Sequence, residues 1–435
     1  MKPADGADWT NWAGNHRATA RVVHPASTAE VAALVRDAAA QGTSVKAVGA
    51  GHSFTDAAMT TGLRVSLDRL ASVMSVDRSA GLVAVGAGLS LRELNAALDA
   101  HGLALPNLGD IDAQTVAGAL ATGTHGTGAR LGCLSTFVAA LELVTGSGEV
   151  IRCSPTERSD VFAAALVNVG ALGVVTEVTL RCVPAFVLRA DERPMPLSSV
   201  LASLDELADS NDHFELYWFP YTSLALTKRN NRVAVSDAPL SRFRGWLDDE
   251  LLSNRVFGVA CRLARVAPRV VRPLNRVSAR ALSARTYTGP SASVFCTPRR
   301  VRFVEMEYGL PRAAVREAFA GLRSVVDGLP FPIVFPVEVR FTAADDIWLS
   351  HGYGRDSAYI AIHQYVGMPY QAYFERFEQV AVALGGRPHW GKMHHLDAAA
   401  LAGAYPRFGD FLAVRDKLDP DRVFANAYTQ RVFGE

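Results

Sequence analysis

The sequence predicts an α+β fold in two domains, and three observations lead to this prediction. The chain has 435 residues, whereas a single domain usually has about 100–200. Apolar residues make up 49% of it and charged residues 20%, so a sizeable core can form. Short strand and helix patterns mix without the strict alternation of a parallel sheet, and glycine becomes sparse beyond Pro184.

In the first part of the chain, apolar spacing and capping residues predict each element in turn. A helix is expected at Thr28–Ala40, where Gly42 ends it, and another at Ser90–Ala100, which opens with the capping-box pattern Ser90…Glu93. Strands are expected at Val45–Val48, Leu63–Leu67, Leu82–Val85, Phe137–Thr145, Val150–Cys153 and Val174–Cys182. Fourteen of the 35 glycines lie between residues 42 and 132, so this part is expected to bring backbone close to a ligand.

The second part of the chain has a different composition. Only three glycines lie between residues 191 and 308, as in an ordinary packed domain. The expected elements are strands at Val301–Tyr308, Ile333–Phe341 and Ala358–Tyr365, the last half-buried because apolar and polar residues alternate, and a helix at Tyr370–Leu384. Between Arg255 and Arg285 the chain carries eight arginines and no acidic residue, and Pro268 and Pro273 are expected to interrupt any helix there.

The charge and cysteine counts exclude several classes of protein. There are 44 basic and 43 acidic residues, a balance that argues against a nucleic-acid partner. The five cysteines are widely spaced without a CxxC pair, so we expect reduced, mostly buried thiols rather than disulfides or a zinc site. The chain shows no secretory leader and no apolar run of the roughly 18–20 residues that span a bilayer, so a cytoplasmic location is expected.

The first candidate ligand motif is Gly49-Ala50-Gly51-His52-Ser53-Phe54, directly after an expected strand. Successive backbone N–H groups with little side-chain bulk suit a diphosphate. The motif lacks the Lys-Ser/Thr pair of a P-loop and the third glycine of a dinucleotide-binding fingerprint. A glycine-rich turn without a ligand is the alternative interpretation.

The second candidate motif is the segment Gly109–Gly128. It combines glycines and threonines at close spacing, namely Gly118, Gly123, Gly126, Gly128, Thr115, Thr122, Thr124 and Thr127. Hydroxyl and amide donors around closely approaching backbone can wrap a large anionic cofactor without Lys or Arg. A purely structural glycine-rich loop is the alternative.

Two expected strands carry candidate catalytic side chains. Glu338 and Arg340 are two residues apart, so they share one face of a strand. The alternative for such a pair is a surface ion pair. His363 lies within the strand expected at Ala358–Tyr365, where a core histidine with satisfied hydrogen bonds is the alternative.

A histidine-rich segment follows the last expected helix. His389-Trp390-Gly391-Lys392 is followed by His394 and His395. A metal site is conceivable here, but the segment lacks the HExxH spacing and a companion carboxylate.

Together these motifs, in this order, resemble the vanillyl-alcohol-oxidase-type flavoproteins, and among them the sugar-1,4-lactone oxidoreductases that act on L-gulono-1,4-lactone or D-arabinono-1,4-lactone. The resemblance runs from about Trp9 to Val432. It implies an α+β, two-domain FAD-binding fold with a cap domain built on an antiparallel sheet. The implied limits are residues 1–185 for the FAD-binding domain, 186–400 for the substrate-binding cap, and 401–435 for a segment that packs back on the FAD domain.

The resemblance implies FAD as cofactor, attached covalently through His52. No cysteine occurs in the loops expected to face the flavin, so a second covalent link is not expected. The residues assigned to FAD are Gly49, Ala50, Gly51, His52, Ser53, Phe54, Gly109, Asp110, Gln114, Thr115, Gly118, Thr122, Gly123, His125, Gly126 and Val175.

The implied reaction is oxidation of the C2 carbinol of an aldono-1,4-lactone by hydride transfer to flavin N5. His363, supported by Glu338, would take the hydroxyl proton, and Arg340 and Lys392 would hold the developing negative charge. An alditol or sugar oxidase of the xylitol or sorbitol type, which makes hydrogen peroxide, is the alternative. The alditol-oxidase pattern has Ala-Ser where this chain has Gly109-Asp110, which favours the lactone branch.

The expected partners are a sugar lactone or polyol and an electron acceptor, either oxygen or a quinone or protein. Gly109 matches a family position whose side-chain size affects oxygen access, and glycine leaves room for oxygen. The arginines of Arg255–Arg285 suggest peripheral contact with anionic lipid or with an acidic acceptor protein, and a solvated helix face is the alternative.

Overall fold

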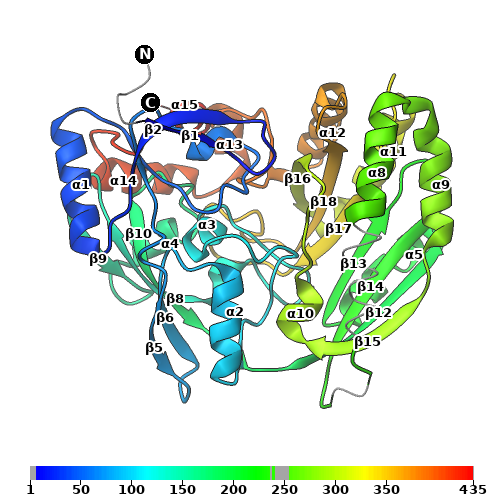
Figure 1. Ribbon diagram of the computed structural model, residues 1–435, viewed down its shortest axis with the longest axis horizontal. Helices are drawn as coiled ribbons and strands as arrows, with labels where there is room; N and C mark the ends of the chain where they lie inside the picture. The colour runs from blue at the N-terminus through cyan, green and yellow to red at the C-terminus, as the bar shows by residue number, and fades with distance from the viewer. Residues whose placement is uncertain (1–5, 236–237, 241–253, 435) are drawn as a thin grey trace.

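Two groups of elements lie side by side in the computed structural model, which describes residues 6–235, 238–240 and 254–434 (Figure 1). The first group contains two larger sheets, a two-stranded pair and their helices, and the second is built on one large sheet. Every neighbouring pair of strands in the large sheet is antiparallel. The predicted α+β class and the antiparallel sheet of the second part are therefore confirmed.

The first group holds a mixed and an antiparallel sheet. The mixed sheet has the order β1 (Gly6–Thr10), β2 (Arg17–Val23), β4 (Leu63–Val65) and β3 (Val45–Ala47), with β2, β4 and β3 parallel. The antiparallel sheet has the order β5 (Val73–Asp77), β6 (Leu82–Gly86), β10 (Val174–Arg181), β8 (Val138–Val144) and β9 (Val150–Cys153). A small pair of strands joins β7 (Leu103–Ala104) to β11 (Val183–Pro184).

Helices from both ends of the chain share the core of this first group. They are α1 (Thr28–Ala40), α2 (Leu91–Ala100), α3 (Val116–Ala121), α4 (Ser159–Ala165), α13 (Ala398–Ala404), α14 (Phe408–Leu418) and α15 (Ala427–Phe433). Val35, Leu94, Leu143, Phe411 and Phe433 belong to one buried cluster, and the blue and red ends of the ribbon lie together (Figure 1). The domain limits at residues 185 and 400 stay predictions.

The large sheet has eight strands. Their order is β15 (Arg285–Pro290), β12 (Val187–Pro196), β14 (Leu224–Val233), β13 (His213–Trp218), β17 (Val337–Thr342), β18 (Ser357–Tyr365), β16 (Phe303–Pro311) and β19 (Arg387–Pro388). The helices of this half are α5 (Leu197–Ala202), α6 (Leu204–Asp209), α8 (Phe257–Val266), α9 (Val271–Ala281), α10 (Ser291–Phe295), α11 (Val315–Asp327) and α12 (Gln371–Ala383). Short 3₁₀ turns are η1 (Asp56–Ala58), η2 (Leu134–Phe137), η4 (Pro268–Val270) and η5 (Arg312–Ala314).

The two faces of the large sheet differ in chemistry because side chains alternate along a strand. Leu216, Val339 and Ile360 point to one face and pack with Phe319 of α11 and Phe377 of α12. The opposite positions carry polar side chains, namely Glu215 and Tyr217 on β13, Glu338 and Arg340 on β17, His363 on β18, and Glu305 and Glu307 on β16.

The polar face is buried as well, because it lies against the first group. Gly128 of the glycine-rich loop forms a bridge to Thr342, and the Thr127 carbonyl lies 2.7 Å from His213 Nδ1. The strand β18 is therefore buried on both faces over Ser357–Gln364, and the expectation that it would be half-buried is wrong. An alternation of apolar and polar residues shows that the two faces of a strand differ, but not whether the polar face meets solvent or a buried polar interior.

Most expected elements of the sequence are confirmed within a residue or two. The α1 bounds are as expected, and Ser90 with Glu93 forms the predicted capping box at α2. The strand β17 begins at Val337 rather than Ile333. Pro268 separates α8 from α9, but Pro273 lies in the first turn of α9, where no intrahelical donor is needed, and does not interrupt it.

Two further expectations concern membranes and cysteines. Within the described ranges, no helix combines the length and apolar character that crossing a bilayer requires. All five cysteines are free, and Cys133, Cys153 and Cys261 are buried. Burial raises the pKa of the Cys133 thiol to about 12, so it is an inert core group.

Candidate active site

Two adjoining cavities follow the glycine-rich segments: the first lies between them and the polar face of the large sheet, and the second is lined by the first group alone. Both open to solvent, and the empty space they outline, part of it solvent, is about 580 Å³ for the first and about 720 Å³ for the second. They share His52, Ser53, Gln114 and Thr122 as lining residues. Together they form one elongated site, as a dinucleotide cofactor requires.

The turn Gly49–Phe54 forms one wall of both cavities. It leaves β3 and bends back, with Gly51 at φ +70° and its carbonyl accepting the Trp12 N–H at 2.8 Å. A Cβ on Gly49 would overlap the Thr115 hydroxyl. Glycine is therefore required at both positions, at Gly49 for close approach and at Gly51 for its backbone conformation.

The segment Gly109–Gly128 forms the opposite wall. Thr115 caps α3, and the Gln114 amide donates to the Thr124 hydroxyl at 3.1 Å. The residues of this segment predicted to bind FAD that line a cavity are Gly109, Asp110, Gln114, Thr115, Gly118, Thr122 and His125. Gly123, Gly126 and Val175 line neither cavity; Gly123 has φ +70° and lies against His351, so it shapes the loop instead.

The second cavity fits the anionic half of FAD. Its lining contains the Gly49–Ser53 turn and no carboxylate, and Lys46 is its charged residue besides the titratable His52. The Lys46 ammonium is buried and lies 3.3 Å from the Gly170 carbonyl. Burial, helped by Arg415, lowers the pKa of Lys46 to about 7, which a bound diphosphate would reverse. These residues would hold the diphosphate and leave the first cavity to the flavin ring.

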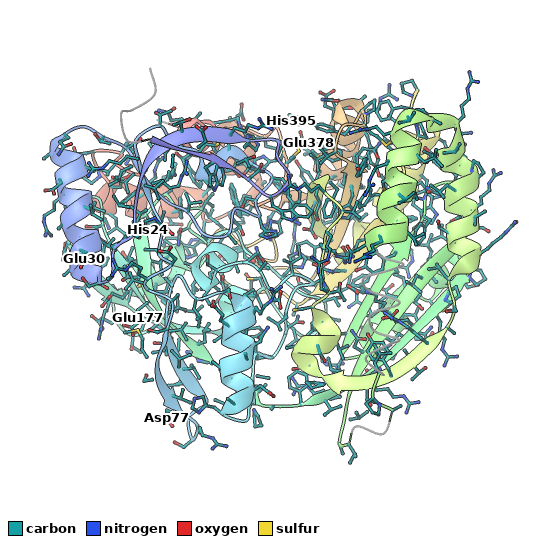
Figure 2. The ribbon with its side chains drawn as sticks, in the orientation of Figure 1. His24, Glu30, Asp77, Glu177, Glu378 and His395 are labelled. Atoms are coloured by element: carbon teal, nitrogen blue, oxygen red, sulfur yellow. The ribbon has the colours of Figure 1, made fainter. Side chains whose placement is uncertain are left out.

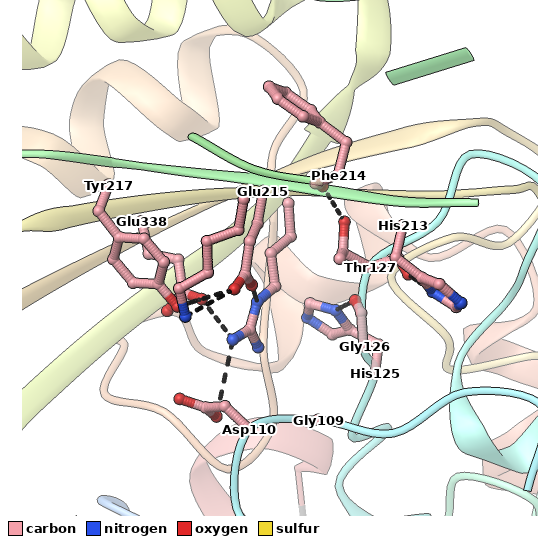
Figure 3. Close-up of polar contacts among 12 residues, drawn as sticks. Gly109, Asp110, His125, Gly126, Thr127, His213, Phe214, Glu215, Tyr217 and Glu338 are labelled. Atoms are coloured by element: carbon pink, nitrogen blue, oxygen red, sulfur yellow. Dashed lines mark hydrogen bonds and ion pairs between the residues drawn. The ribbon is translucent and has the colours of Figure 1, made fainter. Parts of the chain in front are cut away.

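A polar network centres on Arg340 at the first cavity, and Figure 3 labels its acidic partners Glu338, Glu215 and Asp110. The guanidinium contacts Glu338 two residues away, Glu215 at 3.0 Å and Asp110 at 3.7 Å. Tyr217 donates to Glu338 at 2.7 Å. Since Glu338 and Arg340 are both buried, the alternative of a surface ion pair for them is excluded.

The pKa values of the carboxyl groups around Arg340 are shifted in different directions. Burial, only partly opposed by Arg340, raises the pKa of Glu338 to about 7. Burial would also raise the pKa of Glu215, but Lys228 and Arg340 lower it to about 2. Although burial opposes it, Arg340 and Arg299, which is 2.7 Å from Asp110, hold the pKa of Asp110 well below its usual range. Glu338 is therefore the carboxyl group of this set that is poised to exchange a proton near neutral pH.

His363 pairs with a different carboxylate from the one expected. Its Nε2 lies 3.3 Å from Glu305 Oε1, while Glu305 Oε2 contacts the Lys392 ammonium. Glu338, the support expected for His363, acts on it through its charge, which raises the pKa of His363, while its direct contacts are with Arg340 and Tyr217. The antiparallel register explains the pairing with Glu305, since His363 lies opposite Glu305 on β16. Lys392 lines the first cavity, whereas Glu338 and His363 lie just behind its lining.

The histidine-rich segment divides among three environments. His389 lies with His125 and Glu307 in a cluster whose ligand atoms are within 4.8 Å of one another. His394 contacts the Tyr428 hydroxyl at 3.0 Å, and His395 contacts Glu378 at 3.0 Å (Figure 2). The segment does not bring its own histidines into one ligand set.

The tautomer of His389 argues against a metal at this cluster. Its Nδ1 accepts the Gly391 N–H at 3.0 Å, so Nε2 keeps the ring hydrogen and has no lone pair for a cation. Burial lowers the pKa of His389 to about 3, which keeps it neutral. His125 Nε2 lies 3.3 Å from Glu307, so the two form a buried pair beside the cavity.

Several site residues lie outside the sequence prediction. They are Glu215, Tyr217, Arg299, Glu305 and Glu307. The available signal was the spacing of charges along strongly apolar strands, as in FVEMEYGL around Glu305 and Glu307. Carboxylates at alternate positions of such a strand indicate a buried polar face.

Known proteins resemble this chain along nearly its whole length. The family described as D-arabinono-1,4-lactone oxidase matches residues 178–432, and the FAD-binding domain family matches residues 19–154. The chain is 45% identical to the L-gulono-1,4-lactone dehydrogenase of Mycobacterium tuberculosis over 429 residues, covering 98% of this chain and 99% of that protein. It is 34% identical to the L-gulonolactone oxidase of Mus musculus over 439 residues, covering 98% of each.

A solved structure agrees on the fold. The cholesterol oxidase of Brevibacterium sterolicum superposes with a TM-score of 0.84 at 17% identity, covering 99% of this chain and 98% of that one. At this identity the likeness concerns the fold alone. The chain belongs to the D-arabinono-1,4-lactone oxidase family, and it is an FAD-dependent oxidoreductase that acts on CH–OH groups.

Proposed function

We propose that this enzyme oxidises the C2 carbinol of an aldono-1,4-lactone of the L-gulono or D-arabinono type. The observation that carries the proposal is the buried set of Arg340, Glu338 and Lys392 beside a cavity bordered by both glycine-rich segments. The 45% identity to an L-gulono-1,4-lactone dehydrogenase supports the same substrate class. A panel of L-gulono-1,4-lactone, D-arabinono-1,4-lactone, xylitol and sorbitol tests it; faster flavin reduction by the polyols would favour an alditol oxidase instead.

The residues of the site divide the chemical work. FAD, when bound, supplies the two-electron acceptor for the hydride. Arg340 and Lys392 stabilise the negative charge that develops on the substrate oxygen, in a buried site where such contacts are strong. His363 accepts the hydroxyl proton at Nε2, because its Nδ1 is engaged with the Pro336 carbonyl at 3.1 Å. Glu338 pairs with the Arg340 guanidinium and accepts a hydrogen bond from Tyr217, and these contacts hold the guanidinium in place.

The charges around the cavity are arranged in pairs, which suits a neutral substrate. Arg340 is matched by Glu338 and Glu215, and Lys392 is matched by Glu305. A lactone offers hydroxyl and carbonyl groups to such a surface and adds no net charge. An open-chain aldonate would bring a carboxylate next to buried acids and bind more weakly.

We propose that His52 carries the flavin covalently. The imidazole borders both cavities and stacks on Trp12 at 5.6 Å between ring centroids. Burial and the nearby Lys392 lower the pKa of His52, so the ring is neutral and nucleophilic at pH 7. Acid precipitation of the purified protein tests this: flavin colour should stay in the pellet for the wild type and move to the supernatant for His52→Ala. Colour in the supernatant of the wild type would refute it.

We propose that oxygen can reach the reduced flavin past Gly109. A Cβ at this position would lie 3.2 Å from the His125 carbonyl oxygen, so any side chain there would narrow the approach. Anaerobic reduction by a lactone, followed by timed reoxidation with air or with a quinone, distinguishes an oxidase from a dehydrogenase. Slower reoxidation by air than by a quinone would assign another physiological acceptor.

We propose that helices α8 and α9 dock on an anionic lipid surface. Val259, Leu263 and Val266 are 58%, 51% and 81% exposed and follow each other at helical spacing, while Cys261 and Ala264 face inward. Seven of the eight arginines of Arg255–Arg285 lie on or beside these helices and give the apolar stripe the basic flanks of an interfacial helix, whereas Arg285 lies on β15 and pairs with Glu192. The protein itself would remain cytoplasmic.

A vesicle assay tests this surface. The protein should sediment with phosphatidylserine-containing vesicles and less with pure phosphatidylcholine, and a V259S/L263S/V266S variant should lose binding. Val382→Ser, which alters an exposed valine on α12, is the matched control. Equal sedimentation of the triple variant and the wild type would refute lipid docking.

A further inference from the structure

Glu305 has a central place among the proposed catalytic groups. Its side chain is buried on β16, with 6% of its surface exposed. One carboxylate oxygen lies 3.3 Å from His363 Nε2, and the other contacts the Lys392 ammonium. A single carboxylate thus connects the imidazole that receives the substrate proton to the cation that meets the developing charge.

The hydrogen bonds of His363 determine which ring nitrogen is basic. Nδ1 lies 3.1 Å from the carbonyl oxygen of Pro336, which can only accept, so Nδ1 carries a hydrogen. Nε2 is then the ring atom that can bind or release a proton. Nε2 faces Glu305. When Nε2 binds a proton, the imidazolium and the Glu305 carboxylate form an ion pair. When the ring is neutral, its lone pair points at the negative carboxylate, which is unfavourable.

On balance, the groups around His363 favour the protonated ring. Glu305 of β16 and Glu338 of β17 present negative charge, and Lys392 presents positive charge. The other neighbours are the apolar rings of Phe303 and Phe335. Although burial opposes it, Glu305 raises the pKa of His363.

We propose that Glu305 is a positioning residue of the reaction, which holds His363 Nε2 and Lys392 Nζ in register and stabilises the imidazolium formed when the substrate hydroxyl loses its proton. With FAD bound, the flavin would accept the hydride and its two electrons from the carbinol carbon; the hydroxyl proton ends on His363 Nε2, where it bridges to Glu305, and the C–O bond becomes C=O. The inference rests on the proposed role of His363 in lactone oxidation.

The same strand provides a matched control. Glu307 lies two residues further along β16, on the same face and equally buried, and it also faces a histidine. That histidine is His125, at 3.3 Å, rather than His363. Glu305→Gln and Glu307→Gln therefore remove the same charge from the same strand, but only the first removes it from His363.

The first experiment is a titration of His363 by NMR in histidine-labelled holoenzyme, which needs no turnover. Glu305→Gln should lower the pKa of His363 by about one unit or more, since a carboxylate in contact shifts a pKa by about 1–3 units. Glu307→Gln should leave the pKa of His363 unchanged. Glu305→Asp keeps the charge and should retain most of the raised pKa, which also covers the case in which the Gln variant does not fold.

The second experiment is the pH profile of anaerobic flavin reduction. The acid limb of the Glu305→Gln profile should move to lower pH, because the less stabilised imidazolium loses its proton at lower pH. The plateau rate should fall about 10–100-fold, because the neutral ring is then a weaker base. An unchanged His363 pKa and an unmoved limb in Glu305→Gln would overturn the proposal. If His363→Gln reduces flavin at the wild-type rate, the proposed role of His363 fails instead, whatever Glu305 does.

Discussion

Replacing Arg340 by methionine should reduce both catalysis and stability, and the loss of stability should depend on pH. The guanidinium is buried and contacts Glu338, Glu215 at 3.0 Å and Asp110 at 3.7 Å. Removing it leaves two buried carboxyl groups, Glu338 and Glu215, and the partly buried Asp110 with less positive charge nearby. Breaking a buried ion pair from one side typically costs about 3–5 kcal/mol.

Glu215 gives an independent estimate of this cost. Burial would raise its pKa, but Lys228 and Arg340 lower it to about 2 from 4.5. At roughly 1.4 kcal/mol per pKa unit, that shift corresponds to about 3 kcal/mol of stability, and Lys228 would retain part of it in the variant. We therefore expect Arg340→Met to lose about 3 kcal/mol at pH 8, of which Glu215 accounts for about half.

The sign of the pH dependence follows from Glu338. Burial raises its pKa to about 7 and Arg340 opposes this rise, so removing Arg340 raises the folded pKa further. At pH 5 Glu338 is protonated in the folded protein with or without Arg340, whereas at pH 8 it is ionised in the wild type and less so in the variant, so the destabilisation should be larger at pH 8 than at pH 5. Glu215 contributes equally at both pH values, because its stabilisation is lost only as the pH falls below about 4.5 toward 2. Denaturant unfolding at both pH values measures it, with Arg340→Lys as a variant that keeps the charge but not the fork geometry.

Flavin reduction is the second readout for Arg340→Met. Loss of one donor to a developing oxyanion slows such a step by about 10²–10³-fold. Stopped-flow mixing with a lactone under anaerobic conditions measures this rate, and the flavin content should remain that of the wild type. Wild-type reduction, or an equal loss of stability at pH 5 and pH 8, would refute the charge-based reasoning for Arg340.

Three further substitutions test separate parts of the site. Gly49→Ala places a Cβ against the Thr115 hydroxyl and should lower the FAD content of the purified protein, measured by absorbance; full occupancy would show that the turn tolerates a side chain. Gly109→Ala should slow reoxidation by air without slowing reduction by lactone, and an unchanged oxygen rate would remove Gly109 from the oxygen path. Lys392→Met should slow flavin reduction by about 10²–10³-fold in the same stopped-flow assay, and a near-wild-type rate would exclude it from charge stabilisation.

The sequence was sufficient to predict the local elements and the glycine-rich walls of the site. Capping residues and apolar spacing predict α1 and α2 well, because these signals act within a few residues. The Gly49–Phe54 turn is recognisable for a similar reason, since close approach of backbone requires glycine. The face shared by Glu338 and Arg340 follows from the two-residue period of a strand.

Pairings between distant strands could not be predicted in the same way. The register of β16 against β18 sets Glu305 opposite His363, and no local pattern contains that register. The burial of β18 on both faces depends on the first group of elements covering the polar face, which is a tertiary effect. The carboxylates of β16 were visible as charges in an apolar run, but their partners were not.

The most direct test of the account is anaerobic titration of the purified protein with L-gulono-1,4-lactone, followed by the visible absorption of its flavin. The wild type should lose the oxidised-flavin band completely at saturating lactone, and Arg340→Met should retain it over the same time despite equal flavin content. A wild-type flavin that neither this lactone nor D-arabinono-1,4-lactone reduces would contradict the proposed reaction.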